Sequence, residues 1–123
     1  MKNLILLLSC FSFIACQNKE DKKTPNSVDE TTKKVSGQEL FDGEGNCIAC
    51  HKPDQKIIGP SLKDISKIYK AKKGSIVAFL KEDAEPLVDP SQYDIMKTNF
   101  AITKSMSGEE LKALEDYIYS FSK

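Results

Sequence analysis

Five consecutive residues constrain this chain more than any others: Cys47-Ile48-Ala49-Cys50-His51. They spell Cys-x-x-Cys-His, the pattern through which c-type haem is attached to proteins. Two cysteines three positions apart on one helical turn lie on the same side of the chain, so both sulfurs can reach the vinyl groups of one haem. His51 follows at a position from which its imidazole can bind the iron. The segment therefore predicts one covalently bound haem c held by Cys47 and Cys50, with His51 as an iron ligand.

Two other chemistries use the same cysteine spacing. A zinc site needs a second pair of ligands, and no cysteine or histidine follows His51. A thioredoxin-like pair normally opens a helix after a buried strand, whereas Leu40 and Phe41 precede this motif on a helical pattern and no βαβ pattern follows. A haem-free thiol–disulfide module that uses Cys47 and Cys50 stays an alternative, as does a chance match to a short motif.

Residues 1–15 predict a signal peptide. Lys2 supplies a positive charge, and the apolar run from Leu4 to Ala15 has the length of a signal h-region and is too short to span a bilayer. The run ends at Ala15-Cys16, which resembles the cleavage site of bacterial lipoproteins, whose cysteine is acylated and becomes the new N-terminus. An ordinary secretory signal cleaved near Ala15 is the alternative. In both cases Cys10 would be removed with the signal. Cys10 itself, after Leu8-Ser9, is a second candidate for acylation, with a very short h-region before it.

Residues 16–35 predict a flexible linker, which a lipid on Cys16 would tether to a membrane. The segment is polar and charged, and its two apolar residues, Val28 and Val35, are too few to build a core. The predicted product is an exported lipoprotein that faces the periplasm or the cell surface. The four cysteines agree with export. Cys10 would be removed, Cys16 would be acylated, and Cys47 and Cys50 would be bound to haem, so that no free thiol would remain in an oxidising compartment.

Residues 36–123 predict a single folded domain. The chain has 18 basic residues, all of them lysine, and 18 acidic residues, so its formal net charge is zero. A nucleic-acid-binding domain would need a concentrated basic patch, and we therefore expect no nucleic-acid partner. We expect the protein to be a monomer.

Capping residues and apolar periodicity predict that this domain is all-α. Ser36 with Glu39, and Ser107 with Glu110, fit capping boxes that would begin the first and last helices. The expected helices are a short one through residues 40 and 41, one over 61–69, one over 76–82 and one after 107. The stretch 93–103 lacks strong periodicity, so we expect a loop with one helical turn there.

The segment Gly59-Pro60-Ser61-Leu62, which follows the haem motif, completes a resemblance to the monohaem class I cytochromes c. In that family the carbonyl of the proline accepts a hydrogen bond from the second ring nitrogen of the proximal histidine. Carried over, Pro60 would orient His51 and raise its basicity, and Leu62 would pack on the haem.

The resemblance covers residues 36–123 and implies a fold. Helices would wrap around one covalent haem, and the N-terminal and C-terminal helices would cross. An aromatic pair often meets at that crossing, and Phe41 and Tyr117 are the candidates. Because haem would fill much of the core of so small a domain, we expect the haem-free polypeptide to be largely unfolded.

The sixth iron ligand is expected to be a methionine, because His51 is the only histidine. Met96 lies between the third and the last expected helices, where the resembled family keeps its axial methionine. Met106 abuts the capping Ser107 and is the second candidate. A lysine amine, water or an empty position are the remaining alternatives. A thioether ligand would raise the reduction potential relative to a second histidine.

These inferences predict a one-electron carrier rather than an enzyme. It would serve a bacterial respiratory or dehydrogenase-linked chain and exchange electrons with redox proteins. Lysines near the motif would steer an acidic partner or form a solvated surface; they are Lys52, Lys56, Lys63, Lys97 and Lys104. The alternative function is a haem-based ligand sensor or small haem enzyme with an open sixth position.

Overall fold

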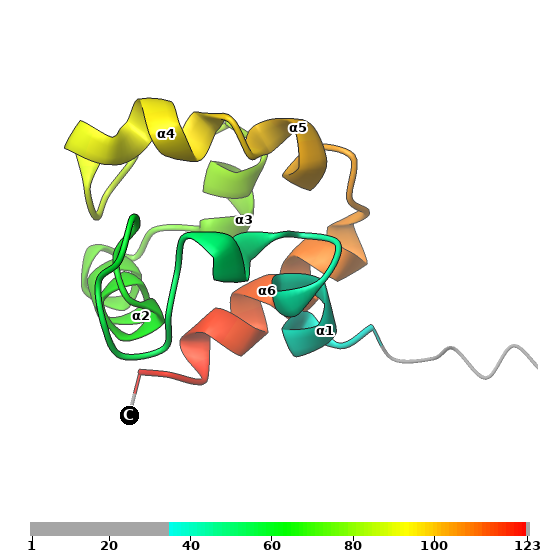
Figure 1. The fold of residues 1–123 in the computed structure, drawn as a ribbon, viewed down its shortest axis with the longest axis horizontal. Helices are drawn as coiled ribbons and strands as arrows, with labels where there is room; N and C mark the ends of the chain where they lie inside the picture. Colours follow the sequence, from blue (N-terminus) through cyan, green and yellow to red (C-terminus); the bar gives the residue numbers. More distant parts are fainter. Residues whose placement is uncertain (1–34, 123) are drawn as a thin grey trace, which may run out of the picture. The chain divides into compact units, whose positions relative to one another are not determined.

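The computed structural model describes residues 35–122, and all regular secondary structure in that range is helical (Figure 1). The elements are α1 (Gly37–Asp42), η1 (Cys47–Ala49), α2 (Leu62–Lys72), α3 (Ile76–Leu80), η2 (Pro90–Gln92), α4 (Tyr93–Lys97), α5 (Phe100–Thr103) and α6 (Gly108–Tyr119), where η marks a single 3-10 turn. The predicted all-α fold is confirmed. The predicted signal peptide, Cys10, Cys16 and the linker up to residue 34 lie outside the described residues.

Serine side chains begin four of these helices. Ser36, Ser61, Ser75 and Ser107 each accept a hydrogen bond from the backbone N–H three residues later. At α6 the capping box is complete, because the side chain of the glutamate at the third helical position bonds back to the serine backbone. No helix in the described range has the length and apolar character needed to cross a membrane.

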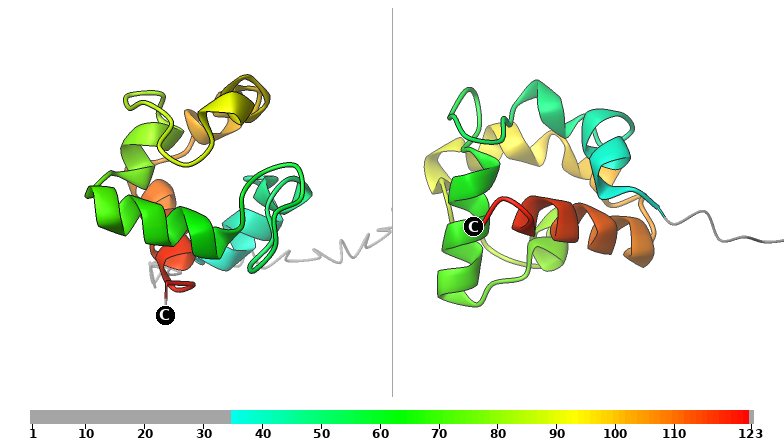
Figure 2. Two further views of the ribbon diagram at one scale, coloured as in Figure 1. Left: turned by 90° about the vertical axis from the view of Figure 1, so that its left-hand side faces the viewer. Right: turned by 90° about the horizontal axis from the view of Figure 1, so that it is seen from below.

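The first and last helices, α1 and α6, pack directly against each other (Figures 1 and 2). The rings of Phe41 and Tyr117 meet with their centroids 5.4 Å apart, so the predicted aromatic contact is present. The backbones of α1 and α6 come close together at Gly37, where a Cβ atom would stand 2.0 Å from the carbonyl oxygen of Ala113. Close backbone packing therefore holds the two ends of the domain together.

Replacing Gly37 by alanine is expected to force α1 away from α6. The added methyl group has no room beside the Ala113 carbonyl, so we expect Gly37→Ala to lower the free energy of unfolding by about 3 kcal/mol. Gly108→Ala is the matched control, because no atom lies within 4 Å of a Cβ at that position. Denaturant unfolding of the holoprotein measures both, and an equal loss in the two variants would contradict the close approach.

The stretch 93–103 is mostly helical, so the prediction of a loop with one helical turn was wrong. Together η2, α4 and α5 form what we call the arch, residues 90–103, which lies along the upper edge of Figure 1. Its aromatic rings Tyr93 and Phe100 pack on Phe79, with centroids 6.3 and 5.3 Å away. The buried Thr103 hydroxyl donates to the Leu80 carbonyl at 2.7 Å. These tertiary contacts stabilise helical turns that the local sequence pattern does not specify.

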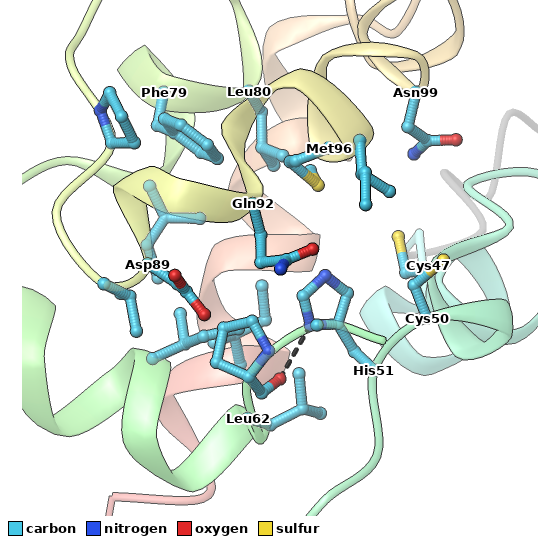
Figure 3. A pocket seen from close by; sticks show the side chains of 18 of the residues that line it. Cys47, Cys50, His51, Leu62, Phe79, Leu80, Asp89, Gln92, Met96 and Asn99 are labelled. Carbon is cyan, nitrogen blue, oxygen red and sulfur yellow. Dashed lines mark hydrogen bonds between the residues drawn. The ribbon is translucent and has the colours of Figure 1, made fainter. Parts of the chain in front are cut away.

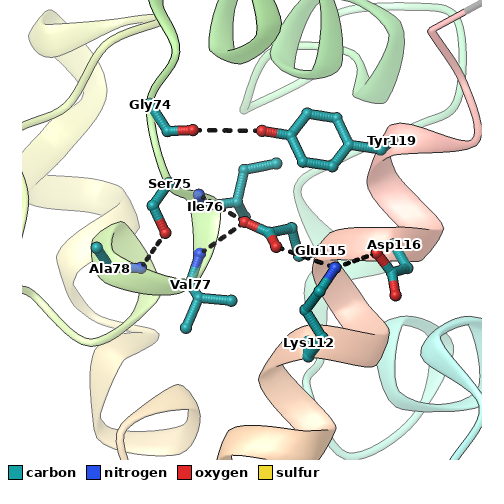
Figure 4. Close-up of polar contacts among 9 residues, drawn as sticks. All are labelled: Gly74, Ser75, Ile76, Val77, Ala78, Lys112, Glu115, Asp116 and Tyr119. Atoms are coloured by element: carbon teal, nitrogen blue, oxygen red, sulfur yellow. Dashed lines mark hydrogen bonds and ion pairs between the residues drawn. The ribbon is translucent and has the colours of Figure 1, made fainter.

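A carboxylate from α6 fixes the start of α3 (Figure 4). Oε1 of Glu115 accepts hydrogen bonds from the backbone N–H groups of Ile76 and Val77, at 3.1 and 3.4 Å. A helix leaves its first N–H groups without intrahelical partners, and this side chain satisfies two of them. The contact matters for the site because α3 carries Phe79 and Leu80, which line the cavity described next.

Candidate functional site

A cavity of about 190 Å³ opens between the η1 segment, α2, α3 and the arch (Figure 3). Its wall is mostly aliphatic and aromatic. The predicted site residues Cys47, Cys50, His51, Pro60, Leu62 and Met96 all line it. His51 and Met96 face each other across the cavity, and the two cysteines lie at one side.

A single 3-10 turn presents the two cysteines. The residue before it, Asn46, adopts the left-handed conformation with φ 50°. The backbone N–H groups of Cys50 and His51 both bond to the carbonyl of Cys47, at 3.1 and 3.0 Å. This tight turn directs two thiols and one imidazole toward the same cavity, as the spacing of the motif predicts.

The Cys47 thiol is poorly suited to thiol–disulfide chemistry. Burial raises its pKa to about 11, the neighbouring Cys50 and Asp42 add to the rise, and a backbone hydrogen bond opposes it. Reactive redox cysteines instead have a lowered pKa, because the thiolate is the nucleophile. The thiol donates to the Gly45 carbonyl at 3.4 Å. These properties argue against the haem-free redox module.

Pro60 holds His51, as the resemblance to the class I cytochromes c implied. Its Nδ1 lies 2.7 Å from the carbonyl oxygen of Pro60. A carbonyl oxygen can only accept, so Nδ1 carries the proton and Nε2 keeps its lone pair for a metal. Burial lowers the pKa of His51, while the bond to Pro60 acts in the opposite direction. The imidazole is therefore neutral at neutral pH, the form that binds iron.

Gly59 backs the imidazole, and alanine there is expected to displace it. A Cβ atom at Gly59 would stand 2.4 Å from Cε1 and 2.8 Å from Nδ1 of His51. We expect Gly59→Ala to lower the unfolding free energy by about 2 kcal/mol and, if the cavity holds haem, to change the absorption spectrum of the haem-bound protein. Gly108→Ala again serves as the control. A Gly59→Ala spectrum identical to that of the parent protein would show that the ring is free to shift.

The structure separates the two methionine candidates. Met96 on α4 lines the cavity opposite His51. Met106 is 7% exposed and packs in the hydrophobic core with Leu111 and Leu114. Met96 is therefore the thioether that the fold brings to His51.

Two polar contacts that the sequence did not reveal join the two sides of the cavity. Nδ2 of Asn99, on the arch, donates to the Gly45 carbonyl at 3.0 Å. Nζ of Lys56, in the loop after the haem motif, pairs with Asp89 at 2.7 Å. Both contacts bridge large sequence separations, and the local pattern carries no signal for them. The Asn99 contact ties the arch to the segment that carries the cysteines, and the Lys56 pair joins the loop after the haem motif to the residue that precedes the arch.

Three of the five lysines expected to steer a partner are engaged within the domain. Lys56 pairs with Asp89, while Lys97 and Lys104 both pair with Glu82, at 3.5 and 2.9 Å. Exposed pairs of this kind contribute little stability, but they neutralise charge that a partner would otherwise meet. The expectation of a steering surface is correspondingly weakened at these positions.

The residues around the cavity fit a covalently bound haem. Two thiols, a neutral imidazole nitrogen and a thioether converge on an apolar space, which matches the ligand types of c-type haem. A zinc site has no support, because within residues 35–122 no group of three or more His, Cys, Asp or Glu side chains could hold a metal ion. Cys47 and Cys50 would hold the haem, and His51 and Met96 would reach its iron.

Comparisons with known proteins point to the same chemistry. The family model described as cytochrome c matches residues 35–122. A segment of 26 residues is 54% identical to cytochrome c-552 of Nitrosomonas europaea, and covers 21% of this chain and 25% of that protein. The matched part of the chain thus spans a quarter of the length of this relative.

Proposed function

Because this chain belongs to the cytochrome c family, whose members bind haem c covalently, we propose that it is a one-electron carrier with its haem iron ligated by His51 and Met96. The haem, when bound, supplies a reversible one-electron couple. The observation that carries the proposal is the placement of His51 and Met96 on opposite sides of one apolar cavity, with both cysteines at its edge.

Each side chain has a distinct task in this proposal. Cys47 and Cys50 would hold the haem through thioether bonds. The Pro60 carbonyl fixes the tautomer and orientation of His51, and Leu62, which is 1% exposed, closes the cavity beside it. His51 and Met96 would both bind the iron, so that no substrate would have to bind there.

The arch keeps the sixth ligand in place. Its contacts with Phe79, Leu80 and Gly45 hold α4 over the cavity, so that Met96 needs little rearrangement when the oxidation state changes. The aliphatic wall excludes water, and a dry, apolar surrounding is one of the levers that set the potential of a haem.

The proposal extends to location and partners. A lipid on Cys16 and the 16–35 linker would keep the domain near a bacterial membrane, exported to the periplasm or the cell surface. Its partners would be redox proteins of a respiratory or dehydrogenase-linked chain, and the carrier would act as a monomer. The apolar run before Cys16 and the polar composition of the linker support this part of the proposal.

A potentiometric titration of the matured protein tests the function. We expect one reversible electron per haem, with the same low-spin state at both ends of the titration. Addition of carbon monoxide to the reduced protein is the companion measurement. Rapid carbon monoxide binding would instead favour the ligand-binding sensor or small haem enzyme, because it requires an open sixth position.

A further inference from the structure

The side chain of Gln92 is an unassigned polar group in the cavity. Gln92 lies at the end of η2, where its backbone N–H bonds to the Asp89 carbonyl at 3.1 Å. Its side-chain amide points into the cavity (Figure 3), and no partner for that amide occurs within residues 35–122. The neighbouring polar groups Asp89 and Asn99 are engaged, by Lys56 and by the Gly45 carbonyl.

The helical geometry explains why Gln92 points inward. Gln92 and Met96 are four residues apart across η2 and α4, and residues at this spacing share one face of a helix. That face meets the cavity, where Leu80 and Val88 are apolar neighbours. Gln92 is partly exposed, and every buried side-chain nitrogen or oxygen within residues 35–122 has a partner, so its free amide is open to water and to an occupant of the cavity. A polar group on the occupant of the cavity can therefore replace water as its hydrogen-bond partner.

The chemistry of haem identifies which part of the occupant this is. The peripheral polar groups of haem are its two propionate carboxylates, and these lie on the half of the ring away from the vinyl groups. Cys47 and Cys50 would take the vinyl groups at one side of the cavity. Asp89 lies at the other side, and the Gln92 side chain lies between Asp89 and His51 (Figure 3). No lysine lines the cavity within the described residues. The donors that line it include Gln92 and the hydroxyl groups of Tyr69 and Tyr93, and Figure 3 shows the Gln92 amide directed into the cavity.

We propose that Gln92 donates a hydrogen bond from its side-chain amide to one propionate carboxylate of the bound haem. Gln92 is then a positioning residue, which fixes the edge of the haem opposite the cysteines and compensates part of its negative charge. The inference rests on the proposed function in one respect, namely that haem is attached at Cys47 and Cys50.

Nuclear magnetic resonance of the reduced holoprotein tests the contact directly. The Gln92 amide protons are assigned as the pair that disappears in Gln92→Leu. We expect nuclear Overhauser effects between these protons and the methylene protons of one propionate, together with slowed exchange with water. Effects to the Met96 methyl group in place of the propionate, or fast exchange with no haem contact, would overturn the proposal.

The pH dependence of the reduction potential supplies a second readout. A hydrogen bond to the ionised carboxylate favours that form, so its loss in Gln92→Leu is expected to raise the midpoint of the propionate titration by about one pH unit. Gln55→Leu, an exposed glutamine outside the cavity, is the matched control. The titratable groups that line the cavity together with Gln92 are Cys47, Cys50, His51, Tyr69, Asp89 and Tyr93, and Lys56 pairs with Asp89.

Asp89 is the carboxylate whose own ionisation needs to be separated from that of the propionate. Its pKa is lowered by hydrogen bonds from Lys56 and Ser91, and the comparison is therefore repeated in an Asp89→Asn background, where the shift caused by Gln92→Leu is expected to persist. A midpoint equal to that of the Gln55→Leu control would contradict the proposal.

The experiments distinguish a failure of the Gln92 proposal from a failure of the electron-carrier proposal. Covalent haem with a low-spin spectrum, combined with an unshifted titration, would reject the role of Gln92 and leave the electron carrier intact. Absence of covalent haem after expression with haem-attachment machinery would reject both.

Discussion

Met96→Ala is expected to open the sixth coordination position and to lower the reduction potential by on the order of 0.1–0.3 V, within the roughly 0.8 V range that axial ligands control in haem proteins. The thioether of Met96 lies opposite His51 across the cavity, and alanine cannot reach the iron from that position. Potentiometry and carbon monoxide binding to the reduced variant measure the change.

Met106→Ala is the matched control for this experiment. Met106 is 7% exposed in the core beside α6, so its truncation leaves a cavity and is expected to cost about 2–4 kcal/mol of unfolding free energy. The spectrum and the potential should stay those of the parent protein. If Met106→Ala opened the sixth position and Met96→Ala did not, the assignment of the axial ligand would be reversed.

The second large effect is expected on removal of the haem itself. An empty cavity of about 190 Å³ corresponds to a penalty of about 5 kcal/mol at the measured cost of residual cavity volume. That penalty is comparable to the whole stability of a typical small domain, about 5–15 kcal/mol. Far-ultraviolet circular dichroism of Cys47→Ser/Cys50→Ser polypeptide, made without haem attachment, should therefore show little helix.

The matured holoprotein is the reference for this comparison, measured at the same concentration and pH. The double serine variant also removes any disulfide between the two cysteines, so that lost helix reflects the lost haem. A cooperative melt of the haem-free polypeptide with the helix content of the holoprotein would contradict the expectation, and would show that α1 and α6 hold the fold without it.

Much of this fold could be predicted because its signals are local. Ser36, Ser61, Ser75 and Ser107 cap helices through contacts that span three residues. The haem motif likewise acts within one turn. The hydrogen bond from His51 to Pro60 spans nine residues and was implied by family resemblance, since no short-range rule requires it.

The rest depends on contacts between distant segments. The arch is helical because Tyr93 and Phe100 pack on Phe79 and because Thr103 bonds to Leu80, and neither contact leaves a periodic pattern in residues 93–103. The wrong prediction of a loop over residues 93–103 also affected the predicted site. Without a helix at α4 the sequence gives no reason to place Gln92 on the same face as Met96.

In the proposed carrier, His51 and Met96 together close the coordination of one covalent haem. The most direct measurement is an absorption spectrum of the matured protein when oxidised, when reduced, and when reduced under carbon monoxide. We expect a sharp c-type spectrum on reduction that carbon monoxide leaves unchanged, and a weak far-red thioether-to-iron band on oxidation. A high-spin spectrum that shifts with carbon monoxide would show that Met96 is not bound, and would contradict the electron-carrier proposal.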